Sequence, residues 1–144
     1  MTEITRENFL AAMRKAVEMR GEDYVYPSLE EDPSLRGDAG ECLYSKDGQP
    51  QCIIGMALYL IDPALMPTNV EKDELALNWA GDEHLYPHLD MDANPVLRRR
   101  GVADRGLLDA AEHAQSLQDS GRRWGEALEE YENALRAAPL VSSW

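Results

Sequence analysis

Cys52 is the residue of this chain that is best suited to nucleophilic chemistry. We expect it about two positions into a helix, where unpaired amides and the helix dipole favour a thiolate. His84 and His88 follow it in the chain, and Asp90 and Asp92 come after them. This is the order of nucleophile, base and orienting carboxylate in some cysteine hydrolases. The order permits such an enzyme, with Cys52, His88 and Asp90 as the candidate catalytic residues and His84 as the other candidate base.

Cys52 also has a structural interpretation. It begins the apolar run Cys52–Ile61, and a free cysteine is most often a small buried residue. The pattern predicts few strands, so little would hold a histidine rigidly against the thiol. We therefore assign no catalytic residue and favour a protein that is not an enzyme.

Metal binding is the second chemistry that these residue types permit. The candidate ligands are Cys42, Cys52, His84 and His88. Nine residues separate the two cysteines, unlike the close pair of a structural zinc site, and Pro87 prevents one helix from carrying both histidines. We therefore expect neither a metal nor a cofactor.

Arg98, Arg99 and Arg100 form a basic cluster in an otherwise acidic chain. Such a cluster could bind a phosphate or an acidic segment of a partner. The favoured interpretation is that it pairs with carboxylates of the same chain. The carboxylates expected to do so are Asp90, Asp92 and Asp104.

Composition and charge indicate a small globular protein. The 144 residues are 44% apolar and 28% charged, which suits a single domain over residues 1–144. A net charge of −13 repels phosphate backbones and anionic lipid, so direct nucleic-acid binding is disfavoured. The run Cys52–Ile61 is too short to cross a bilayer, and the first 20 residues show no secretory signal. We therefore expect a cytoplasmic protein with both thiols free.

The apolar spacing predicts a mainly α fold with minor β. We expect a compact helical domain with a short two-stranded β-ribbon and a C-terminal helix hairpin that turns at Gly121. Thr5 and Asp104 are the expected N-caps of two helices. The expected helices span about 5–20, 52–61, 69–80, 105–119 and 123–138, with a brief helical turn between Asn94 and Gly101.

The expected ribbon lies in the first half of the chain. It pairs the segment Tyr24–Tyr26 with the segment Cys42–Tyr44. Asp47-Gly48 then makes a turn, and Pro50 suits the first position of the next helix. Residues 27–41 are expected to form a long solvated loop.

The last predicted helix carries a known pattern. Its aromatic, small and terminating residues are Trp124, Ala127, Tyr131, Ala134 and Pro139. In this respect the segment resembles the second helix of a tetratricopeptide repeat. One copy is present, whereas such arrays need about three. The resemblance implies a helix hairpin, and it does not imply a peptide-binding groove.

A wider pattern extends over most of the chain. It comprises Cys42-Leu43-Tyr44, Gly48, Pro50, Cys52 and Gly55, followed by Gln118-Asp119, Gly121 and Trp124-Gly125. The pattern resembles a group of small acidic proteins encoded by actinobacteria and their bacteriophages. The resemblance implies the setting of a bacterial host cell and does not imply an activity.

We therefore expect a non-enzymatic protein–protein interaction protein. A phage or prophage factor that binds a host protein fits this expectation, and so does a homodimer. Two alternatives stay open: a cysteine-dependent hydrolase that uses Cys52 with His84 or His88, and an acidic inhibitor that mimics DNA.

Overall fold

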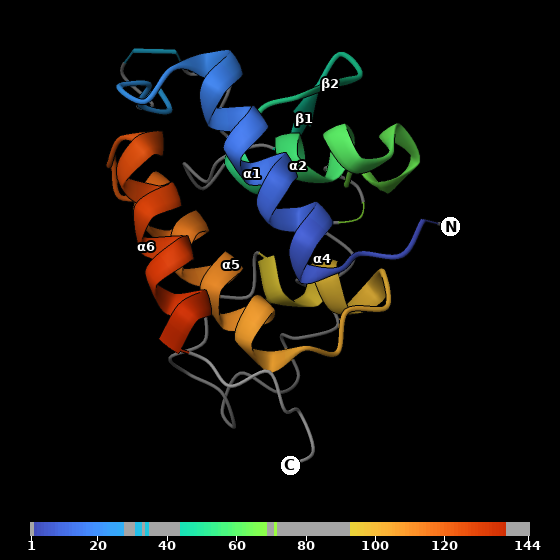
Figure 1. The fold of residues 1–144 in the computed structure, drawn as a ribbon. Coiled ribbons are helices and arrows are strands. Elements are labelled where there is room, and N and C mark those ends of the chain that lie inside the picture. The colour runs from blue at the N-terminus through green and yellow to red at the C-terminus, as the bar shows by residue number, and fades with distance from the viewer. Residues whose placement is uncertain are drawn as a thin grey trace, which may run out of the picture.

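The computed structural model is mainly helical, with a small antiparallel sheet and a C-terminal helix pair, as the sequence predicts (Figure 1). It describes residues 2–27, 31–32, 34, 44–68, 71 and 93–137. The elements are α1 (Arg6–Arg20), β1 (Ser45–Lys46), β2 (Gln49–Pro50), α2 (Ile53–Ile61), the 3-10 helix η2 (Pro63–Leu65), α4 (Ala93–Arg99), α5 (Arg105–Asp119) and α6 (Trp124–Ala137).

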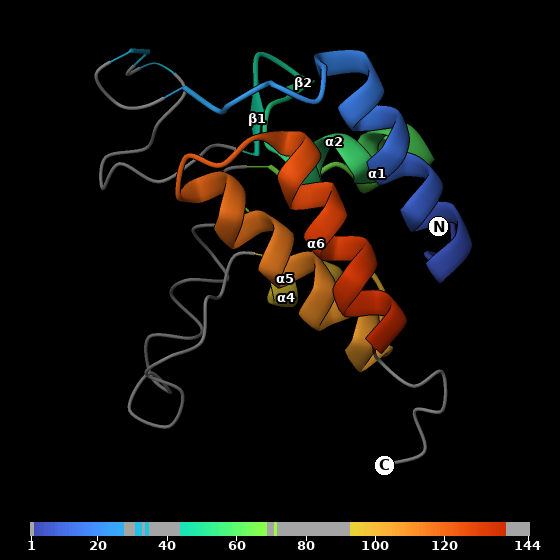
Figure 2. The ribbon, with the colours of Figure 1, turned by 60° about the vertical axis from the view of Figure 1, so that its left-hand side comes forward.

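The helices enclose one apolar core. α5 and α6 lie side by side as a hairpin in both views, while α1 packs on α2 and also contacts α6 (Figures 1 and 2). α2 is apolar on nearly every side, and its residues from Ile53 to Leu58 are all buried. A helix of this kind is stable only at the centre of a fold. The largest fully buried side chains are Trp124, Tyr26, Tyr44, Tyr131, Phe9 and Met13.

Capping residues set the helix ends that the sequence predicts. The Thr5 hydroxyl accepts a hydrogen bond from the Asn8 amide, and the Asn8 side chain accepts one from the Thr5 amide. This reciprocal pair satisfies two amides that α1 would otherwise leave unpaired. Gly21 ends α1 with a φ of 99°, a conformation that favours glycine. Within the described ranges, no helix has both the length and the apolar character needed to cross a bilayer.

Asp104 caps α5 and also joins it to α1. Its Oδ1 accepts from the Leu107 amide at 3.3 Å, and its two oxygens accept from Arg6 Nε at 2.5 Å and Nη2 at 2.8 Å. These bonds, chiefly those from Arg6, hold the pKa of Asp104 below its usual range. The sequence predicted that Asp104 pairs with the cluster at residues 98–100. That prediction was wrong, because the fold brings Arg6 to it.

The Arg6–Asp104 pair is expected to make stability depend on pH in the acid range. Since the pKa of Asp104 is lowered by folding, its contribution is present above the unfolded pKa of about 3.9 and is lost as pH falls through the folded pKa. Asp104→Asn should keep the cap, because asparagine caps as well as aspartate, and should lower the free energy of unfolding at pH 7 by about 1–2 kcal/mol.

Urea unfolding of both proteins at pH values from 7 down to 2 checks this expectation. The difference between wild type and Asp104→Asn should shrink steadily below about pH 5. A difference that stays constant over the whole range would contradict it.

The ribbon forms, but in a different place from the one predicted. Ser45 pairs with Pro50 and Lys46 with Gln49, around a two-residue loop of Asp47 and Gly48. Both loop residues have positive φ values, 54° and 77°. Asp-Gly is the sequence that such a tight hairpin turn prefers, and its twist matches that of the strands it joins.

Two other predictions, of a strand and of a helix start, are also wrong. Residues Tyr24–Tyr26 form no strand, because the Tyr24 carbonyl accepts instead from the Trp124 amide at 2.8 Å. Pro50 ends β2 and does not begin α2, which starts at Ile53. The predicted helix 69–80 and loop 27–41 lie largely outside the described residues, as do Cys42 and Leu43.

Candidate functional site

Cys52 is the N-cap of α2, not a residue within its first turn. Its side chain is 0% exposed, and Sγ accepts a hydrogen bond from the Gly55 amide at 3.2 Å. Gly55 must lack a side chain here, since a Cβ would lie 2.9 Å from the Tyr44 carbonyl oxygen and 3.3 Å from Sγ. The sulfur therefore lies inside the core against Gly55, where it completes the helix end.

Gln118 of α5 supplies the second cap of α2. This side chain is 0% exposed, and its Oε1 accepts from the Ile53 amide at 2.7 Å. Its Nε2 donates to Asp119 Oδ1 at 2.9 Å. The first amides of a helix have no partner within the helix, so a buried N-terminus needs such acceptors from elsewhere. A sequence signal that could have found Gln118 is its position three residues after Gln115, since this spacing places both on the buried side of α5.

The proposed partners of Cys52 lie outside the described residues. These partners are Cys42, His84, His88, Asp90 and Asp92. The described residues hold no group of three or more histidines, cysteines or acidic residues placed to bind a metal ion. The structure thus shows the surroundings of Cys52. The candidate catalytic triad and the candidate set of metal ligands stay predictions.

Arg100 is a largely enclosed structural cation. Its guanidinium donates to both oxygens of Glu71, at 2.6 and 2.7 Å, and to the carbonyls of Leu65 at 2.6 Å and Val96 at 2.9 Å. Arg100 and Glu71 side chains are 9% and 14% exposed. The prediction that this cluster pairs with a carboxylate of the same chain is therefore correct for Arg100, although Glu71 was not among the carboxylates named.

The two preceding arginines differ from Arg100. Arg98 is exposed and donates to Asn94 in the preceding turn of α4 at 2.6 Å. Arg99 is half-exposed, with Nη1 3.8 Å from Glu71. Among the contacts between described residues, Arg100 is the arginine of this cluster whose side chain its partners enclose.

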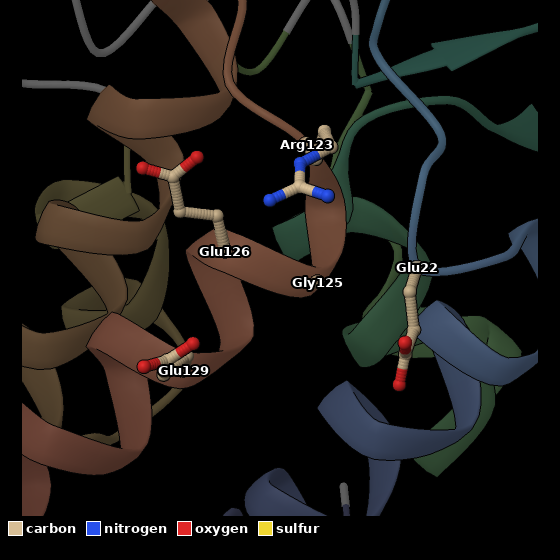
Figure 3. A pocket seen from close by; sticks show the side chains of 5 residues that line it. All are labelled: Glu22, Arg123, Gly125, Glu126 and Glu129. Carbon is tan, nitrogen blue, oxygen red and sulfur yellow. The ribbon is translucent and has the colours of Figure 1, made fainter.

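An open hollow of about 200 Å³ lies where α6 begins, between α6 and the segment that follows α1. Glu22, Arg123, Gly125, Glu126 and Glu129 line it (Figure 3). The carboxylates of Glu126 and Glu129 extend from one side of α6, and Glu22 lies on the other side of Gly125. We refer to these five residues as the acidic hollow.

The start of α6 is held against the segment after α1 by its own backbone. The Gly125 amide donates to the Glu22 carbonyl at 2.9 Å. A Cβ at Gly125 would lie 2.9 Å from that same oxygen, so only glycine permits the approach. Arg20 of α1 stacks over both Tyr24 and Trp124, with its guanidinium carbon 4.9 and 5.2 Å from the two ring centres. These contacts fix Glu22 beside α6.

The charges around the hollow are only partly paired. Arg123 forms an ion pair with Asp23 at 3.2 Å, and Arg122 with Glu126 at 2.8 Å. Glu22 and Glu129 make no ion pair with any residue that the structure describes. The hollow therefore presents unneutralised carboxylates, and what it can do chemically is attract cationic groups. Sequence reasoning missed it, because Glu22 and α6 are about 100 residues apart.

Fold and surface together define a small, mainly helical protein with an acidic hollow beside its C-terminal helix pair. No family model, curated protein or solved structure matches the chain.

Proposed function

We propose that this chain is a non-enzymatic protein–protein interaction protein that binds a basic surface of a partner through the acidic hollow. The observation that carries the proposal is the placement of Glu22, Glu126 and Glu129 around one opening, where Glu22 and Glu129 make no ion pair with any described residue. The net charge of −13 supports it, because such a charge speeds encounter with a basic partner.

The use of the other polar residues also supports this proposal. Cys52 and Gln118 cap α2 inside the core, and Arg100 forms an ion pair with Glu71. Each of these side chains stabilises the fold through bonds to its own chain. Among the carboxylates of the hollow, Glu126 pairs with Arg122. Glu22 and Glu129 make no ion pair with a described residue and can contact another molecule.

The setting extends the proposal. A phage or prophage factor that binds a host protein in the bacterial cytoplasm fits the resemblance described above. A second copy of the chain is a less suitable occupant of the hollow, because two surfaces of the same sign repel each other. A homodimer would need to use another face.

The proposal is tested by affinity purification of a partner, followed by a comparison of the partner's affinity for wild type and for variants that lack carboxylates of the hollow. Tagged protein is used to capture partners from an actinobacterial lysate at low salt, and the captured protein is identified and purified. Glu22→Gln/Glu129→Gln should then weaken its binding roughly tenfold, which corresponds to about 1.4 kcal/mol.

The matched control removes the same charge elsewhere. Asp47 and Asp109 are exposed and make no ion pair with a described residue, so Asp47→Asn/Asp109→Asn should change the affinity by less than about threefold. Equal weakening by both double variants would overturn the hollow as the binding surface. Failure to capture any protein at low salt would count against the interaction function itself.

The same acidity supports a second proposal, an inhibitor that mimics DNA. The supporting observation is again the excess of exposed carboxylates over neighbouring cations. If this is the function, the captured protein should be a nuclease or nucleoid protein, and DNA should compete with the chain for it. The cysteine-dependent hydrolase, with Cys52 and His84 or His88, requires instead a reactive thiol. The alkylation rate of Cys52 at neutral pH tests for such a thiol.

A further inference from the structure

We draw no further inference here: the strongest candidate, the acidic hollow at the start of α6, belongs to the surface already proposed for the partner, and the described residues around it offer no second feature that indicates a particular ligand.

Discussion

Arg100→Met is expected to lower the free energy of unfolding by about 3 kcal/mol or more. The substitution leaves the Glu71 carboxylate, 14% exposed, without the cation that neutralises it. Removing one partner of an enclosed ion pair costs about 3–5 kcal/mol, because the remaining charge is then uncompensated. The carbonyls of Leu65 and Val96 also lose a donor. Arg100→Lys should recover only part of the loss, since an ammonium cannot donate to all these acceptors at once.

The neighbouring arginine provides a matched control for this prediction. Arg98→Met removes the same charge two residues earlier, within α4, but Arg98 is exposed and bonds only to Asn94 among the described contacts. We expect it to change stability by about 0.5 kcal/mol or less. Urea unfolding monitored by circular dichroism measures both variants. Equal effects at residues 98 and 100 would mean that the Glu71 pair does not stabilise the fold as described.

The second large effect is expected from Gln118→Leu. Leucine fills a similar volume but cannot accept the hydrogen bond of the Ile53 amide, which Gln118 accepts at 2.7 Å. A buried amide left without a partner costs about 1–3 kcal/mol. Ile53 is the first residue of the central helix α2. We therefore also expect the substitution to speed amide hydrogen exchange in the first turn of α2.

Gln115→Leu separates this effect from the general effect of replacing a buried glutamine. Gln115 is 1% exposed on the same helix, and the structure gives its Oε1 no hydrogen-bond partner. Its replacement should be neutral or stabilising, since no bond is lost and an unsatisfied polar atom is removed. Thermal and urea unfolding of the two variants provide the comparison. A greater loss from Gln115→Leu than from Gln118→Leu would contradict the capping role of Gln118.

The sequence predicted the long helices well, because their signals are local. Thr5 and Asp104 mark two N-termini, and the expected ranges 5–20 and 105–119 agree with α1 and α5 within one residue. The hairpin turn at Gly121 was also predicted, and its φ of 85° explains the glycine. Periodicity and caps depend on neighbours in the chain, which the sequence shows directly.

The predictions that failed depended on contacts between distant residues. Tyr24–Tyr26 has the composition of a strand, but the start of α6 takes up its backbone acceptor. Arg6 and Asp104 are 98 positions apart, and no local pattern indicates that they meet. The acidic hollow needs Glu22 to lie beside Gly125, which the packing of α1 and α6 determines. Local propensity is overridden wherever tertiary contacts satisfy the backbone in another way.

The central claim is that the Cys52 thiol is a buried helix cap and not a nucleophile. The direct measurement is its alkylation rate at neutral pH in a Cys42→Ser variant, where Cys52 is the only remaining thiol. Because reaction requires opening of the core, we expect a rate at least about a thousandfold below that of the denatured chain. Rapid alkylation of the folded protein, at a rate close to that of the denatured chain or above it, would contradict the claim and favour the hydrolase.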